Sequence, residues 1–133
     1  MPATDKSDKL GRTDIHYATI ERNLPKLRSI IDSGADVNLQ DKTGWTPLHF
    51  ACQNYDVESC RLLILNGATV DIKDLDGNTP LFRATFNCRD NSGDLIKLLM
   101  THGADPDALN NHGVSPALLA ERIANYPVRQ HFT

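Results

Sequence analysis

The sequence has few cysteines, and their number and spacing argue against covalent or metal cross-links. Cys52, Cys60 and Cys88 are an odd set without Cys-x-x-Cys spacing. A disulfide framework uses an even set and a zinc site uses closely spaced ligands, so we expect neither. The sequence therefore predicts free thiols and a reducing compartment, the cytoplasm.

Long apolar segments and an excess of basic residues are also missing. No run of about 18 apolar residues occurs, so we expect no membrane-spanning helix. The polar first nine residues lack the apolar segment of a signal peptide. The formal net charge of −3 argues against nucleic acid as a partner, because phosphate binding requires a basic surface.

Catalytic signatures are absent from the sequence as well. It contains no G-x-S-x-G segment, no H-E-x-x-H segment and no phosphate-binding glycine-rich loop. His102, His112 and His131 do not have the spacing of metal ligands. We therefore expect no catalytic residue, no cofactor and no metal, and a protein that is not an enzyme.

What the sequence does contain is an eight-residue segment that recurs four times. Its copies are GRTDIHYA at 11–18, GWTPLHFA at 44–51, GNTPLFRA at 77–84 and GVSPALLA at 113–120. Their first residues are spaced by 33, 33 and 36 residues, and a Gly-Ala pair recurs in phase from residues 34, 67 and 103. A fixed period of this length predicts a protein built from stacked repeats.

This pattern resembles the ankyrin repeat, and the resemblance covers nearly everything after Leu10. It implies an all-α solenoid of four repeats with short β-hairpin-like fingers. The expected divisions are a flexible tail at 1–10 and an ankyrin-repeat domain at 11–133, with repeats at about 11–43, 44–76, 77–112 and a truncated 113–133. By this resemblance, His16 and His49 tie adjacent loops together, and Phe82 predicts a repacked joint between the third and fourth repeats.

Local signals predict the helices of each repeat. In the second repeat, Thr46 is placed to cap a helix that runs to about Asn54. A second helix is expected from Val57 to about Leu65, with Gly67 ending it in a left-handed conformation. In the last repeat, the first helix is expected to reach about Ala124 and the second to be cut short within 127–133.

The third repeat is three residues longer than the others, and the excess lies between Thr85 and Asp94. Residues 86–93 are polar and loop-like, so the turn between the two helices is the expected place of the insertion. Insertions in repeat proteins often map to the binding face, although a tolerated surface loop is the alternative. Cys88 is expected in this loop and exposed, whereas Cys52 and Cys60 are expected to be buried.

By the same resemblance, a partner contacts the finger tips and the exposed sides of the first helices. Trp45 and Phe86 are expected to anchor the contact, because aromatic residues are enriched at interface hot spots. The alternative for Trp45 is packing on its own finger. The candidate contact residues are Arg12, Ile20, Lys42, Trp45, Gln53, Asn54, Leu75, Asp76, Asn78, Phe86, Asn87, Arg89, Asp90, Asn91, His112 and Arg122.

These residues predict non-covalent binding of another protein through a concave face by a chain that is monomeric when free. The insertion in the third repeat and the ending from Ala120 to Tyr126 resemble those of small bacterial ankyrin proteins, many of which are suspected to be immunity proteins against secreted toxins. Acidic fingers, with Asp71, Asp76 and Asp107 beyond the family pattern, suggest a basic target. The alternative is an adaptor or regulatory inhibitor of a kinase or transcription factor.

Overall fold

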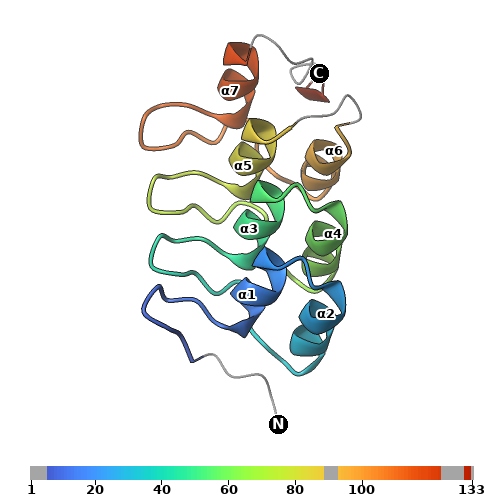
Figure 1. Cartoon of the computed structure of the whole chain (residues 1–133). Coiled ribbons are helices and arrows are strands. Elements are labelled where there is room, and N and C mark those ends of the chain that lie inside the picture. Colours follow the sequence, from blue (N-terminus) through green and yellow to red (C-terminus); the bar gives the residue numbers. More distant parts are fainter. Residues whose placement is uncertain (1–5, 89–92, 124–130, 133) are drawn as a thin grey trace.

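The structure, a computed structural model, describes residues 6–88, 93–123 and 131–132, which contain seven α-helices and no strand. The helices stand in two columns (Figure 1). One column holds α1 (Asp14–Ile20), α3 (Pro47–Gln53), α5 (Pro80–Phe86) and α7 (Pro116–Arg122). The other holds α2 (Leu24–Asp32), α4 (Val57–Leu65) and α6 (Asp94–Thr101). This is the stacked helical architecture that the period predicts.

The first helices of the repeats start as their sequences predict. The Thr46 hydroxyl accepts a hydrogen bond from the backbone N–H of His49 at 3.3 Å. Thr79 and Ser115 cap α5 and α7 in the same way, and a proline follows each cap. Proline is favourable there because the first helical N–H has no intrahelical partner. Helix α1 begins instead with Asp14, whose charge is favourable near the positive end of the helix dipole.

The predicted helix ends in the second repeat are confirmed, and the first helix of the last repeat is shorter than predicted. Gly67, with a φ of +97°, follows α4 as expected. Helix α7 ends at Arg122, before Ala124, because Ile123 leaves helical backbone geometry. Most of the short helix expected within 127–133 lies outside the described residues, and Phe132 packs against the core.

The core lies between the two columns and runs through the repeats. Helices of seven to nine residues are too short to be stable alone, so burial against neighbouring helices must hold them. The fully buried side chains include Leu27, Ala51, Leu63, Leu81, Ala84, Leu95, Ile96 and Leu99. No helix of the described ranges is long and apolar enough to cross a membrane.

Each finger is held by one side chain at its tip rather than by strand pairing. Asp41 Oδ1 accepts hydrogen bonds from the backbone N–H groups of Thr43 and Trp45, both at 2.9 Å. The equivalent acceptors in the other fingers are Asp8, Asp74 and Asn110. The fingers are therefore Asx-type turns, in which one aspartate or asparagine side-chain oxygen accepts hydrogen bonds from its own finger.

The first finger begins earlier than the sequence predicts. Asp8 Oδ1 accepts from the backbone N–H groups of Leu10 and Arg12 at 2.9 and 3.0 Å. The predicted boundary after Leu10 thus falls inside a finger turn. Because Asp8 performs the same task as Asp41, the repeated unit includes it.

Adjacent fingers are joined by backbone hydrogen bonds. Lys42 N donates to the Leu10 carbonyl at 2.9 Å, and Leu75 donates to the second finger in the same way. A Cβ atom on Gly44 would lie 2.8 Å from Asp74 Cα, and its φ is +83°. Glycine is required there because it permits both the left-handed conformation and the close approach.

The repeat histidines join one repeat to the next, as predicted. His49 Nδ1 accepts from the Thr46 N–H at 3.1 Å, which leaves the proton on Nε2. Nε2 then donates to the carbonyl of Asn78 in the following finger at 3.0 Å. His16 donates to the Leu39 carbonyl at 2.9 Å. Burial lowers the pKa of both histidines and favours these neutral forms.

The joint between the third and fourth repeats is repacked, as Phe82 predicts. The buried ring of Phe82 has no group that could donate to the next finger. Side-chain amides replace it: Asn110 Nδ2 donates to Asn78 Oδ1 at 2.9 Å, and Asn111 Nδ2 donates to the Leu75 carbonyl at 2.8 Å.

The expectation that Cys88 is exposed was wrong. Its side chain is only 2% exposed, and Sγ lies 3.7 Å from the Tyr55 hydroxyl. Cys88 comes two residues after α5 ends at Phe86, so the chain is still packed against the preceding repeat. Cys52 and Cys60 are buried as predicted, with their sulfur atoms 3.8 Å apart.

Candidate protein-binding face

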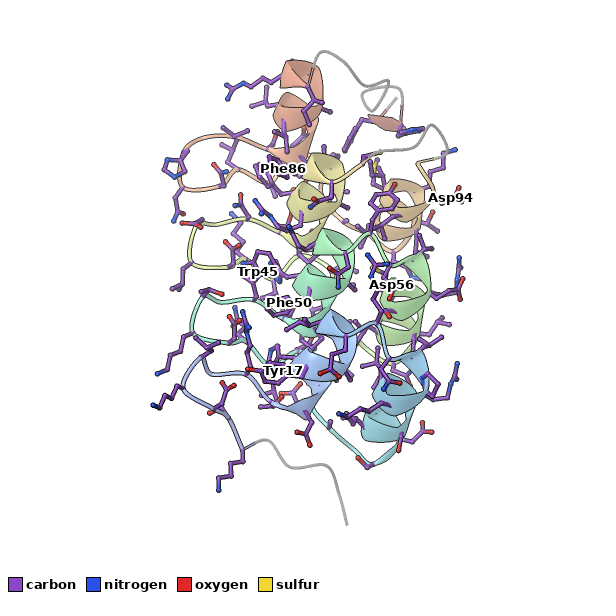
Figure 2. All side chains as sticks on the ribbon, viewed as in Figure 1. Tyr17, Trp45, Phe50, Asp56, Phe86 and Asp94 are labelled. Carbon is purple, nitrogen blue, oxygen red and sulfur yellow. The ribbon has the colours of Figure 1, made fainter. Side chains whose placement is uncertain are left out.

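Aromatic rings and guanidinium groups pack on one another along the side formed by the fingers and the first helices, which we call the finger face. Figure 2 shows Tyr17, Phe50 and Trp45 one above another on this side. The Arg12 guanidinium carbon lies 5.9 Å from the ring centre of Tyr17 and 5.0 Å from that of Phe50. Phe50 packs in turn on Trp45, with ring centres 4.8 Å apart.

The stack continues into the third repeat through Arg83. Its guanidinium carbon lies 5.5 Å from the ring centre of Trp45, 5.6 Å from that of Phe82 and 5.4 Å from that of Phe86. Cations over aromatic rings at these distances attract the π electrons, each by about 0.5–2 kcal/mol. We name this stack the aromatic–guanidinium ladder. Its members are Tyr17, Arg12, Phe50, Trp45, Arg83 and Phe86.

The repeat period places these side chains together. Tyr17, Phe50 and Arg83 lie 33 residues apart, at the same position of three successive first helices. Arg12 and Trp45 are likewise equivalent positions, just before α1 and α3. Equivalent positions of stacked repeats are neighbours in space, so a residue in one repeat packs on its counterparts in the next.

A pocket of about 290 Å³ opens beside the ladder. It is lined by Arg12, Thr43, Trp45, Phe50 and Asp76. The cation of Arg12 is balanced, since Nε lies 3.4 Å from the buried carboxylate of Asp41. Asp76 is exposed and brings a second carboxylate to the pocket. An apolar floor with a few polar groups at its edge is the usual form of a binding pocket.

Arg83 is a charged group of this face with an unsatisfied hydrogen-bond donor. Its side chain is half-buried, its Nε has no hydrogen-bond partner, and its Nη1 lies 3.5 Å from Gln53 Oε1. Within the residues that the structure describes, it forms no ion pair. Burial lowers the pKa of Arg83, and the charges of Asp74 and Asp76 oppose that effect.

The comparison with protein families explains this architecture. The model for ankyrin repeats, in three copies, matches residues 15–110. The chain belongs to the ankyrin-repeat family. A search of curated proteins found no significant match. Ankyrin repeats generally mediate protein–protein interaction, and ankyrin-repeat proteins are typically binding modules rather than enzymes.

Six of the predicted contact residues are exposed on this ankyrin stack. Leu75 and Phe86 expose 69% and 49% of their surface, so they present apolar area to a partner. The exposed residues are Lys42, Leu75, Asp76, Phe86, His112 and Arg122. Arg12 and Trp45 are half-buried in the ladder. Arg89, Asp90 and Asn91 lie outside the described residues.

Other predicted residues hold neighbouring ankyrin repeats together. Gln53 Oε1 accepts from Asn87 Nδ2 at 3.0 Å, and Asn54 Nδ2 donates to the Ile20 carbonyl at 3.2 Å. These side chains line the first-helix column but are already engaged. Asn78 is a correction: it is 7% exposed and its amide bonds the fourth finger, so it offers no side chain to a partner.

The prediction from sequence missed three members of the ladder, namely Tyr17, Phe50 and Arg83. The contact positions transferred from the ankyrin family did not include their place in the repeat. A comparison of the three positions across the 33-residue period could have found them, because two aromatics and an arginine recur there.

The described part of this ankyrin protein holds no grouping suited to a metal. No cluster of three or more histidine, cysteine, aspartate or glutamate side chains occurs in it. Burial raises the pKa of the Cys60 thiol, which disfavours its reactive thiolate form. The finger face presents aromatic rings, cations and hydrogen-bonding groups.

Proposed function

We propose that this chain binds a partner protein non-covalently through the finger face, the predicted concave face, and has no catalytic activity of its own. The observation that carries the proposal is the aromatic–guanidinium ladder, which extends through three repeats beside a pocket. Tryptophan, aromatic and arginine side chains dominate interface energetics. A stack already held by joints between repeats loses little conformational entropy on binding.

Within this function, the partner that we propose is a secreted toxin, which the chain neutralises as an immunity protein in the cytoplasm. Support comes from the resemblance of the Ala120 to Tyr126 segment to small bacterial ankyrin proteins. The buried thiols of Cys52, Cys60 and Cys88 are compatible with a reducing compartment.

Affinity purification with matched variants tests the binding function. Tagged wild-type protein, the double variant Leu75→Ala/Phe86→Ala and a Leu65→Ala control are compared by mass spectrometry of what co-elutes. Leu65 is as exposed as Leu75, at 69%, but lies on α4 in the other column. We expect one stoichiometric partner that the double variant loses and the control retains. Retention by the double variant contradicts binding through the finger face.

Coexpression tests the immunity role separately. If the captured partner is a toxin, wild-type protein should protect cells that express it and the double variant should not. A captured kinase or transcription factor, or a toxin against which the protein gives no protection, contradicts the immunity role. Binding through the finger face survives that result.

A further inference from the structure

We infer that Arg83 is the anchor of the finger face for an acidic side chain, aspartate or glutamate, presented by the partner protein. The inference rests on the proposed binding function and names the chemistry that the face recognises. Arg83 lies inside the ladder, between Trp45 of the preceding repeat and Phe86 of its own helix.

The hydrogen-bonding state of Arg83 is the first reason. A guanidinium group has five N–H donors, yet the described structure gives Arg83 one long contact, 3.5 Å to Gln53. Its Nε is buried without a partner. The free protein has therefore already undergone part of the unfavourable desolvation of this cation. A carboxylate reaching the Nη groups gains charge-assisted hydrogen bonds without meeting that cost again.

The position of the guanidinium group is the second reason. Three rings surround it, with centres 5.4–5.6 Å from its central carbon, and Gln53 lies beside Nη1. Such packing restricts the rotamers of a long side chain. Little side-chain entropy is then lost when Arg83 binds a carboxylate in the bidentate geometry that arginine favours.

The charges around Arg83 are the third reason, and they differ from the basic target that the acidic fingers suggest. Asp41 and Asp74 each accept two backbone N–H groups within their own fingers. Asp71 accepts the backbone N–H of Asp105 at 3.1 Å. These three carboxylates are committed to the fold. Asp76 differs from them, because it borders the pocket with an exposed side chain.

The same face also carries cations beside that carboxylate. Arg12 is paired with Asp41, but Arg83 is not paired, and Lys42 is exposed at the tip of the second finger. Exposed Leu75 and Phe86 supply apolar surface on the third repeat. The face therefore complements an acidic residue that is flanked by an apolar one.

The test is a selection of displayed random peptides against the full chain. Selected peptides are then synthesised and titrated, with the fluorescence of Trp45, the sole tryptophan, as the reporter of binding at the ladder. We expect an aspartate or glutamate beside an apolar residue in the selected sequences. Replacing that acid by its amide, or Arg83→Gln in the protein, should weaken binding about tenfold or more.

Coupling between the two changes distinguishes an anchor from a general charge effect. After Arg83→Gln, the amide substitution in the peptide should cost little more, because the interaction is already lost. Arg83→Lys keeps the positive charge but lacks the planar pair of N–H donors that binds a carboxylate in bidentate geometry. This variant should lose part of the affinity for the peptide. Arg61→Gln removes an equal charge from an exposed position of α4 and should leave affinity unchanged. Circular dichroism melts confirm that each variant folds.

Three results overturn the inference. Selected peptides rich in lysine or arginine whose binding requires Asp76 would reverse the charge of the ligand. Peptides that lose binding with Phe86→Ala but not with Arg83→Gln would leave the proposed function intact and remove the anchor. Failure to obtain any peptide that binds the finger face counts against the anchor, whereas loss of the protein partner in the purification experiment tests the proposed function independently.

Discussion

Arg83 and Trp45 contact each other across a repeat boundary, with the guanidinium carbon 5.5 Å from the ring centre. Trp45 also packs on Phe50 and stacks on His49, whose ring lies 5.8 Å away at an interplanar angle of 29°. His49 in turn holds the next finger. Trp45 therefore belongs both to the joint between repeats and to the candidate binding face, so the two roles that the sequence allows for it are compatible.

Substitution of Trp45 should therefore affect folding as well as binding. We expect Trp45→Ala to lower the free energy of unfolding by about 1–3 kcal/mol, because a half-buried ring loses its contacts with Phe50 and Arg83. Phe86→Ala should cost less than about 1 kcal/mol, since half of that side chain is exposed. Urea unfolding of both variants measures the difference, and equal losses would contradict this division of roles.

The finger turns predict a second contrast, between two neighbouring acids. Asp74→Ala should lower the free energy of unfolding by about 1–3 kcal/mol, because two backbone N–H groups lose their acceptor. Asp74→Asn should cost less than about 1 kcal/mol, since Asn110 performs the same task in the fourth finger. Asp76→Asn removes the same charge from an exposed side chain and is the control.

The denaturant midpoints of these three variants show whether the finger needs the charge of Asp74 or only its hydrogen-bond acceptor. If Asp74→Asn were as damaging as Asp74→Ala, the charge rather than the hydrogen-bond geometry would be what the finger needs. A large loss in Asp76→Asn would show that Asp76 also contributes to the fold, in which case it is not a free acid at the pocket.

The fold was predictable because its causes are local and repeated. Thr46 before Pro47 marks a helix start, and Gly67 marks an end, in a pattern that returns with a fixed period. The prediction for Cys88 failed, because this residue lies where the insertion interrupts the repeat. The polar inserted segment favours an exposed loop position for Cys88, but the burial of that thiol depends on Tyr55, a residue 33 positions earlier.

The candidate site was only partly predictable, because part of it depends on contacts between side chains of different repeats. Exposure of Leu75 and Phe86 follows from their place in the repeat. The ladder instead depends on which side chains meet across repeats, and Arg83 acquires its role from Trp45 in one repeat and Phe86 in its own. Asn78 shows the reverse case, since a residue at a contact position is buried by Asn110 of the next finger.

The buried histidines predict how stability depends on pH. Burial lowers the pKa of His49 and His16 below the ordinary value of 6.5. The unfolded chain therefore binds protons more readily than the folded chain as the pH falls below about 6.5. The stabilisation from the neutral histidines is complete above that pH and is lost as the pH falls towards their folded-state values.

The substitution His49→Phe gives the second repeat the residue that the third repeat has at the equivalent position, Phe82. It isolates the contribution of His49 to the pH dependence of stability. At about pH 7.5 it should lower the free energy of unfolding by about 1–3 kcal/mol, because the Thr46 N–H and the Asn78 carbonyl lose their partner. Between about pH 7 and 5 its stability should fall less steeply than that of the wild type. Urea midpoints across this range measure both effects, and an unchanged slope would contradict the assignment.

The thiols give a prediction that, for Cys88, opposes the expectation from sequence. Cys52, Cys60 and Cys88 are each at most 2% exposed, so an aromatic disulfide reagent should modify none of them rapidly in the folded chain. Burial also raises the pKa of Cys60, which further lowers its thiolate fraction. Unfolding in urea should expose three reactive thiols. Rapid modification of one native thiol, mapped by mass spectrometry to Cys88, would instead support the exposed loop cysteine that the polar insertion suggested.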